Sequence, residues 1–299
     1  MIAAPSATLS SPDEEGIDHD ANAAAVATGD GEQGPHQVLP LTDLPFAALS
    51  GGARSGELVH RVLEKLDFEF GTKADLRERL DLVIPRSGTL RAAMEAVVDG
   101  IGGMLDTPLG GAAGSLKLRQ VRANRRLNEL EFLLPVGRRN AGRLTVSRLA
   151  KVFERHARNA ARKQYAKRLE HLGFPDLEGY LKGFIDLVFE HDGKWYVVDY
   201  KTNLLGPAVS DYAPAALEGP MSVHHYTLQG HLYAVAVHRH LSARMAGYDY
   251  DRHFGGLYYL FLRGMSPGLP AGSGVWHELP GRALIEDLSA LFAPAEVSL

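Results

Sequence analysis

Residues 183–201 read GFIDLVFEHDGKWYVVDYK, and this stretch decides the fold. Two runs rich in β-branched and aromatic residues flank the dipeptide Asp192-Gly193. Asp-Gly between such runs favours a two-residue type I′ turn, which needs positive φ at both central positions. The sequence therefore predicts an antiparallel hairpin with Asp192 and Gly193 at its tip.

The predicted turn also determines which residues face each other across the hairpin. With this tip, Asp186 is opposite Asp199. Residues directly opposite project to the same face, where two like charges are destabilising. Lys201 lies two residues beyond Asp199 and shares that face, because side chains alternate along a strand. We therefore expect two carboxylates and one ammonium group to converge on one surface.

This combination of charges suits a metal-dependent hydrolase. Mg²⁺ is typically held by one or two carboxylates together with water and substrate phosphate. A nearby ammonium group orients the attacking water and stabilises charge on a phosphoryl oxygen. A single Asp-x-Lys is most often a solvated pair on an exposed hairpin. The acid on the facing strand favours a site instead, because a slip of one residue would send Asp186 to the other face.

The same residues resemble a known signature. Asp186 followed after a hairpin by Asp199-Tyr200-Lys201 looks like the motif of the PD-(D/E)XK nucleases, and the surrounding sequence resembles the C-terminal nuclease domain of RecB, the β subunit of exodeoxyribonuclease V. The resemblance covers roughly residues 45–285 and is densest from 180 to 264. It implies an α/β fold with a restriction-endonuclease-like core, in which helices flank a mixed central sheet, plus an N-terminal helical segment. It also implies a Mg²⁺-dependent deoxyribonuclease.

The resemblance assigns metal ligands as well. It implies that Asp186, Asp199, the backbone carbonyl of Tyr200 and His60 hold Mg²⁺, with Lys201 as the catalytic lysine. His60 lies at the margin of an apolar helical stripe, where a lone histidine is more often structural, so its role rests on the resemblance alone.

Three further catalytic positions follow from the resemblance. One of Glu129 and Glu131, in a predicted strand, matches the first active-site glutamate, and Glu129 is favoured. Gln229 and Tyr233, four residues apart on a predicted helix from 224 to about 241, match the family's Gln-Tyr-x-x-Tyr motif. Gly230 stands where that motif has its first tyrosine, which weakens the assignment.

A basic region between residues 117 and 168 predicts DNA contacts. It has sixteen Lys and Arg residues against three acids. Thr145 is the predicted N-cap of one helix that continues to about residue 168. Five basic residues recur on it at steps of three and four, which would place them on one face: Arg148, Lys151, Arg155, Arg158 and Arg162. Charge runs are usually solvated, but the scarcity of acids favours contact with the phosphate backbone.

The chain divides by composition into two parts. Residues 1–44 form a predicted disordered acidic linker, since they have eight acids and no Lys or Arg in 1–43. Residues 45–299 form the predicted RecB-type nuclease domain, with a mainly helical part at 45–128 and a catalytic core at 129–299. Subtracting the −8 of the linker from the total of −4 leaves about +4 for the remainder.

Several classes of protein are excluded. The chain has no cysteine and therefore no disulfide, thiolate zinc site or iron–sulfur cluster. No apolar run is long enough for a membrane span and no secretory signal is present, which predicts a cytoplasmic protein without membrane contact. No GxxxxGK[ST] motif occurs, so ATP-driven unwinding must come from elsewhere.

Three functional hypotheses remain. The first is a RecB-type DNA nuclease that acts on DNA delivered by a RecB-like helicase part, with RecC- and RecD-like subunits as partners. The second is a free-standing repair or restriction nuclease with the same site. The third is a catalytically silent DNA-binding or assembly module, which would be expected to lack an acid or the lysine.

Overall fold

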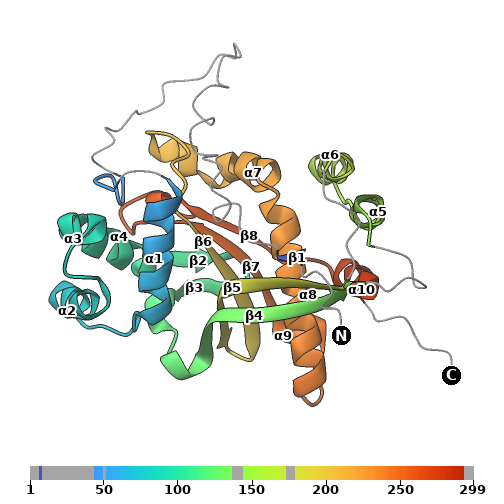
Figure 1. Cartoon of the computed structure of the whole chain (residues 1–299), viewed down its shortest axis with the longest axis horizontal. Coiled ribbons are helices and arrows are strands. Elements are labelled where there is room, and N and C mark those ends of the chain that lie inside the picture. Colours follow the sequence, from blue (N-terminus) through green and yellow to red (C-terminus); the bar gives the residue numbers. More distant parts are fainter. Residues whose placement is uncertain (1–6, 9–43, 50–51, 137–143, 173–178, 293–299) are drawn as a thin grey trace, which may run out of the picture.

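A mixed sheet with helices on both faces forms the centre of the molecule (Figure 1). The computed structural model describes residues 7–8, 44–49, 52–136, 144–172 and 179–292. In these residues the strand order is β1, β5, β6, β7, β8, and β4 also pairs with β5. The pairs β1–β5 and β6–β7 are parallel and the others antiparallel. The strands are β1 (Ala7–Thr8), β4 (Arg126–Val136), β5 (Gly179–His191), β6 (Lys194–Lys201), β7 (Phe254–Phe261) and β8 (Val275–Glu278). The predicted fold class is confirmed.

The hairpin of β5 and β6 has the predicted turn and register. Asp192 and Gly193 have φ of 50° and 76°, as a type I′ turn requires. His191 pairs with Lys194, and the ladder continues in this register to Leu187 and Val198. It ends there, one pair before Asp186 and Asp199. The predicted direct pairing of the two acids is therefore not formed, and the backbone N–H of Tyr200 donates to the Asp186 side chain instead.

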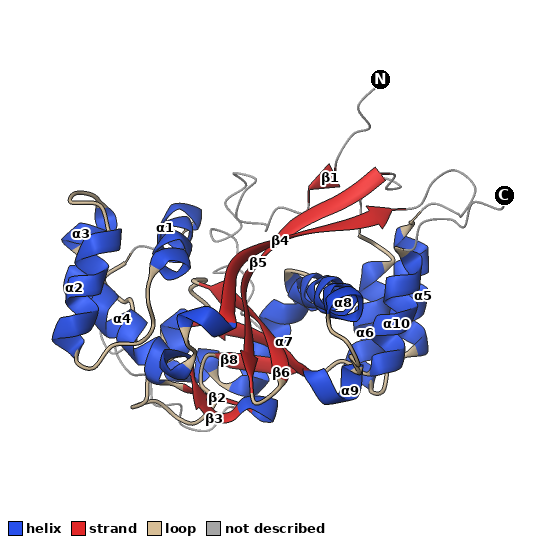
Figure 2. Cartoon of the chain, turned by 90° about the horizontal axis from the view of Figure 1, so that it is seen from below, coloured by secondary structure: helices blue, strands red, loops and turns tan. Residues whose placement is uncertain are grey.

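Opposite faces of the sheet pack on different helices (Figure 2). Tyr196, Val198 and Tyr200 of β6 belong to a core shared with the N-terminal helices, whereas Val197 belongs to a second core under α8. This alternation follows from the two-residue period of a strand. The first core includes α1 (Ala53–Lys65), α2 (Lys73–Val83), α3 (Thr89–Ala92) and α4 (Met94–Asp106). The second includes α5 (Val146–Arg155), α6 (Ala160–Leu169), α8 (Tyr226–Arg244) and α10 (Arg282–Leu291).

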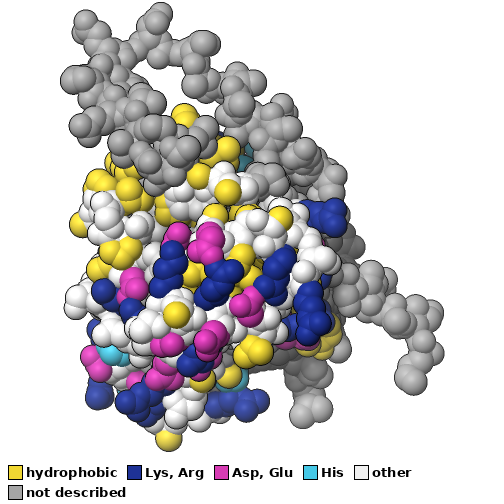
Figure 3. Space-filling view, turned by 90° about the vertical axis from the view of Figure 1, so that its left-hand side faces the viewer, with side chains coloured by type: hydrophobic (Ala, Val, Ile, Leu, Met, Phe, Trp, Pro, Cys, Tyr) yellow, Lys and Arg dark blue, Asp and Glu magenta, His cyan; other side chains and the backbone are white. Residues whose placement is uncertain are grey.

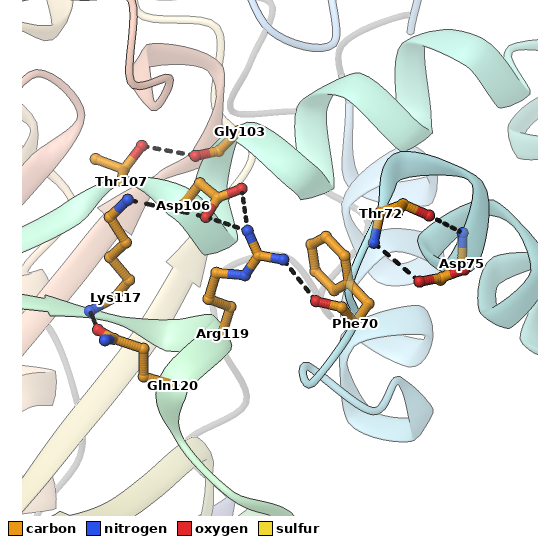
Figure 4. Close-up of polar contacts among 9 residues, drawn as sticks. All are labelled: Phe70, Thr72, Asp75, Gly103, Asp106, Thr107, Lys117, Arg119 and Gln120. Carbon is orange, nitrogen blue, oxygen red and sulfur yellow. Dashed lines mark hydrogen bonds and ion pairs between the residues drawn. The ribbon is translucent and has the colours of Figure 1, made fainter.

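Hydrogen bonds connect the N-terminal helices to the short elements that follow them. Arg119 donates from Nη1 to both carboxylate oxygens of Asp106 at the end of α4, and from Nη2 to the carbonyl of Phe70. Figure 4 shows the guanidinium group between these two partners, with the capping box of Thr72 and Asp75 at the start of α2 beside it. The short elements are β2 (Pro108–Gly110), β3 (Gly114–Lys117) and the 3-10 helices η4 (Gly111–Ala113), η5 (Leu118–Gln120) and η6 (Ala123–Arg125).

The connection from β6 to β7 is largely helical. It contains η7 (Val209–Tyr212), α7 (Pro214–Val223), α8 and α9 (Tyr250–His253), and η8 (Leu262–Gly264) follows β7. The Pro- and Ala-rich composition of residues 207–220 predicts a loop, and this prediction is wrong from Pro214 onward. Pro214 begins α7, where its fixed φ suits a helix and its missing N–H removes no hydrogen bond. The helix predicted from 224 is confirmed as α8.

The single helix predicted from Thr145 to about residue 168 is also wrong. Thr145 is the N-cap, as predicted, and accepts a hydrogen bond from the Arg148 N–H. The helix ends at Arg155, however, and Asn159 starts α6 by accepting from the Arg162 N–H. An asparagine side chain that caps a new helix competes with continuation of the old one.

Two other predictions concern the chain as a whole. Most of the predicted acidic linker, 1–44, lies outside the described residues. Within the described part of the chain, no helix has both the length and the apolar character needed to cross a membrane.

Candidate active site

Asp186 lies on β5, one residue beyond the last pair of the β5–β6 ladder. Its Oδ2 accepts a hydrogen bond of 2.7 Å from the backbone N–H of Tyr200. The carboxylate thus takes the place of the ladder partner that this N–H would otherwise have on β5. Its position is fixed by the sheet itself, with no need for a flexible loop.

His60 reaches the same carboxylate from α1. Its Nδ1 is 3.5 Å from Asp186 Oδ1, and its ring packs edge-on against Tyr200 at 6.0 Å between centroids. Burial lowers the pKa of His60, but the charge and hydrogen bond of Asp186 outweigh burial and raise it to about 9. Burial has the opposite effect on a carboxyl group and would raise the pKa of Asp186. The charges of His60 and then Lys201 outweigh burial and hold this pKa below its usual value.

Glu129 completes a group of three. It has φ of 48°, and the β4–β5 ladder keeps one register on both sides of it without pairing at Glu129 itself. His60, Glu129 and Asp186 each offer one ligand atom, and these atoms lie within 4.8 Å of one another. Glu131 is outside this group, and its carboxylate is 3.2 Å from the ammonium group of Lys182. Of the two predicted glutamates, Glu129 is therefore the one beside Asp186.

Asp199 and Lys201 form a buried ion pair next to the group. The exposed fractions of these residues are 2% and 1%, and Lys201 Nζ lies 2.8 Å from Asp199 Oδ2. Burial raises the pKa of Asp199 to about 7, opposed by the Lys201 ammonium and reinforced by Asp186. The predicted set of two acids and a lysine thus lies around the end of β6, although the two acids have different partners.

The matched family model accounts for this arrangement. The model of the family described as "PD-(D/E)XK nuclease superfamily" matches residues 41–280. The chain belongs to the PD-(D/E)XK nuclease superfamily. It is a nuclease, and Asp186 and Asp199-Tyr200-Lys201 are the residues that resemble the motif of the family.

Curated relatives indicate the branch of the family. The chain is 36% identical over 244 residues to the RecBCD enzyme subunit RecB of Escherichia coli (strain K12), which covers 81% of this chain and 19% of that protein. It is 40% identical over 270 residues to the RecBCD enzyme subunit RecB of Mycobacterium tuberculosis (strain CDC 1551 / Oshkosh), covering 83% and 24%. The protein of the same name from Haemophilus influenzae is 47% identical over 123 residues, covering 41% and 10%. The chain spans a quarter or less of the length of these relatives.

Two tyrosines that the sequence reasoning missed enclose the lysine of the nuclease motif. Lys201 Nζ lies 4.1 Å from the ring centroid of Tyr226 on α8 and 5.7 Å from that of Tyr259 on β7. The two rings are stacked on each other at 5.7 Å. A cation over an aromatic face is stabilised by the ring quadrupole. Tyr226 precedes Gln229 by three residues and so shares its helical face. This spacing was the sequence signal that could have identified Tyr226 as a residue of the site.

Gln229 and Tyr233, the two residues that match the family motif, are both neighbours of residues around the acids, and their catalytic roles stay predictions. Gln229 Oε1 accepts a hydrogen bond of 3.0 Å from the Tyr259 hydroxyl. Tyr233 is buried, and burial, followed by the charges of Asp199 and Asp186, raises the pKa of its hydroxyl. A Cβ added at Gly230 would be 3.0 Å from the Tyr259 ring. Tyr259 thus fills the space beside the position where the motif has its first tyrosine.

The donors in the group fit a hard divalent cation. Two carboxylates and an imidazole supply oxygen and nitrogen ligands, and no thiolate is available to favour a softer metal. Two carboxylates this close repel each other unless a positive charge lies between them. Asp199 is outside the 4.8 Å group, so its predicted role as a ligand, like that of the Tyr200 carbonyl, stays a prediction.

The five basic residues predicted to bind DNA do not form one helical face. Arg148, Lys151 and Arg155 are on α5, Arg158 is in the connection, and Arg162 is on α6. Two of them have acidic partners from distant elements: Arg155 is 2.8 Å from Asp287, and Arg162 is 2.8 Å from Glu278. The predicted scarcity of acidic partners is wrong for these two, since α10 and β8 supply them.

Proposed function

We propose that the chain is the nuclease domain of a RecB-like helicase–nuclease and that it hydrolyses phosphodiester bonds in DNA with Mg²⁺. The observation that carries the proposal is the group of His60, Glu129 and Asp186 beside the buried pair of Asp199 and Lys201. Acid ligands next to a fixed ammonium group suit attack on a phosphodiester, in which charge develops on phosphoryl oxygens.

The residues that would hold Mg²⁺ are His60, Glu129 and Asp186, with Asp199 and the Tyr200 carbonyl as further candidates. When bound, Mg²⁺ would act as a Lewis acid at the phosphate and make a water molecule more acidic. Asp186 is pre-oriented for ligation, because the Tyr200 N–H fixes one of its oxygens and leaves the other toward His60.

Lys201 is the residue that would act on the attacking water. Its ammonium group orients that water and stabilises the negative charge that develops in the transition state. Asp199 and the ring of Tyr226 hold the ammonium group in place, at 2.8 Å and 4.1 Å. Preorganised charge of this kind costs no rearrangement at the moment of reaction.

The names of the relatives support the wider role. Each of the three is a subunit of an enzyme called RecBCD, and this chain matches a small share of each. We therefore propose that RecC- and RecD-like subunits and a RecB-like helicase part are its partners. In that assembly it would degrade linear DNA and act in recombinational repair of double-strand breaks. The chain has no P-loop motif of its own, which fits a nuclease that receives DNA unwound elsewhere.

Cleavage of labelled linear DNA by purified variants, over a titration of Mg²⁺, tests the proposal. Asp186→Asn and Lys201→Met should each lower the cleavage rate by about a hundredfold or more, since each removes a charge at the reacting phosphate. Glu131→Gln is the matched control on the same strand pair, and it should keep the parental rate because Glu131 pairs with Lys182. Parental rates for Asp186→Asn or Lys201→Met would refute the proposed site. Adding the candidate helicase then separates a delivered nuclease from a free-standing one.

A further inference from the structure

A cleft between α6 and α7 lies outside the group of metal-ligand candidates. Its volume is about 590 Å³. One wall is α6, from which Arg162, Lys167 and Arg168 line the cleft, with His171 just beyond the helix. The other wall is α7, with Glu218 and Ser222, and Thr227 of α8 lines it as well. In Figure 1, α6 and α7 lie near the same end of α8.

The positive charge in this cleft is not balanced locally. Arg162 is paired with Glu278, and Glu218 accepts a hydrogen bond from the Trp276 indole. Lys167 and Arg168 are exposed and, among the described residues, have no carboxylate within ion-pair distance. Two cations on one wall therefore face a single carboxylate across the cleft. A polyanion would be attracted to it.

The opposite end of the molecule has a different charge pattern. Figure 3 views the face made by the N-terminal helices, where Lys and Arg side chains alternate with Asp and Glu. Its charges are paired as follows: Lys73 with Asp99, Arg77 with Glu95, Arg79 with Asp67 and Arg91 with Asp81. These four cations gain little from phosphate contact, because each already has a carboxylate partner. The α6–α7 cleft is the better surface for DNA.

The cleft is connected to the candidate active site through α8. Thr227 in its wall directly follows Tyr226, whose ring lies 4.1 Å from Lys201 Nζ. Tyr165, also in the wall, is fixed to α8 because its hydroxyl accepts the Leu228 N–H at 3.0 Å. The basic wall is thus tied to the helix that packs on the lysine of the nuclease motif.

We propose that the cleft between α6 and α7 binds the phosphate backbone of the DNA strand being cut, through Lys167 and Arg168. The inference rests on the proposed function, since it names a binding site for the same substrate. It differs from the prediction that named Arg148, Lys151, Arg155, Arg158 and Arg162. Lys167 and Arg168 line a cleft, whereas Arg155 is paired with Asp287 and Arg162 with Glu278.

Fluorescence anisotropy with labelled oligodeoxythymidylate, measured in EDTA, tests the proposal without any cleavage. The double variant Lys167→Gln, Arg168→Gln should bind about tenfold more weakly at low salt, and the slope of log Kd against log salt should fall by about 1.4. The matched control is Arg86→Gln with Arg244→Gln, which removes the same charge from two exposed arginines outside the basic region of residues 117–168. It should keep the parental slope.

Several outcomes are distinguishable. Equal Kd values and slopes in the two double variants would overturn the proposal, as would a lack of DNA binding by the parent chain. In Mg²⁺, the cleft variant should raise KM with little change in kcat. Because binding is measured in EDTA, it stands apart from the cleavage assay of Asp186→Asn, on which the proposed function depends. Thermal unfolding of each variant checks that the fold is kept.

Discussion

The imidazole of His60 makes metal binding at this site depend on pH. Its pKa is raised to about 9 by Asp186, despite its burial. A proton on His60 competes with a cation, since metals bind the neutral ring. We expect divalent-ion affinity to rise between pH 6.5 and 9, by up to about tenfold per pH unit for one released proton. Calorimetric titration with Mn²⁺ at several pH values measures this, and His60→Asn should flatten the dependence. A parental affinity that falls with rising pH would contradict it.

The raised pKa of His60 also makes the stability of the metal-free protein depend on pH, and this stability falls as the pH rises. A group whose pKa is higher in the folded state stabilises that state below its unfolded pKa, here about 6.5. This stabilisation is lost as the pH rises through about 9. Without metal, urea unfolding should therefore show a parental chain that loses more stability than His60→Asn between pH 6.5 and 9. An equal loss in both proteins would mean that the ion pair with Asp186 does not contribute.

The ring of Tyr226 should matter more than its hydroxyl. The ring lies over Lys201, whereas the hydroxyl donates to Asn203 over 3.4 Å. Tyr226→Phe keeps the aromatic face and should cleave at nearly the parental kcat. Tyr226→Leu removes it and should lower kcat about tenfold, with a smaller change in KM, because a buried cation–π contact contributes about 1–2 kcal/mol. Equal kcat values for the two variants would show that the ring does not position the lysine.

The turn between β5 and β6 can be tested as an element. Gly193 has φ of 76°, and a Cβ added there would meet no atom within 4 Å. Gly193→Ala should therefore destabilise the fold by about 1–2 kcal/mol through backbone strain alone. Lys194→Ala is the control in the same hairpin: Lys194 follows the turn without a positive φ, so alanine there should change stability by less than about 0.5 kcal/mol. Urea unfolding measures both, and a neutral Gly193→Ala would argue against the type I′ turn.

The elements that the sequence predicts correctly are those with local signals. Asp192-Gly193 determines the turn, and the turn determines the register as far as Leu187 and Val198. The end of the ladder at that pair has no local signal, because it depends on the hydrogen bond from the Tyr200 N–H to the Asp186 carboxylate. The alternation of side chains along a predicted strand likewise cannot reveal the positive φ of Glu129.

Contacts between distant elements were the least predictable. Tyr259 reaches Lys201 and Gln229 only because β7 pairs with β6 in parallel, which no short stretch of sequence specifies. The acidic partners within the basic region were unpredictable for the same reason. The spacing of its charges was visible, but the acids that pair with Arg155 and Arg162 are more than a hundred residues away in the chain.

At the scale of the whole molecule, the candidate site needs both halves of the described structure. His60 comes from the N-terminal helices, and Asp186 comes from the sheet. The core that joins them includes Ile101 on α4 together with Val198 and Leu260 of the sheet. Because this core is continuous, the helical part and the sheet should unfold together rather than as two domains.

Ile101→Ala tests this cooperativity. Ile101 is fully buried, so the substitution should cost about 2–5 kcal/mol. Both tryptophans are in the sheet, Trp195 in β6 and Trp276 in β8, and their fluorescence reports on that part alone. The urea midpoint should shift equally in tryptophan fluorescence and in far-ultraviolet circular dichroism. Leu82→Ala, at a position that is 87% exposed on α2, should leave both midpoints unchanged. A shift in circular dichroism alone would mean that the helices bearing His60 unfold separately from the sheet bearing Asp186, and that the group of metal-ligand candidates can come apart while the sheet stays folded.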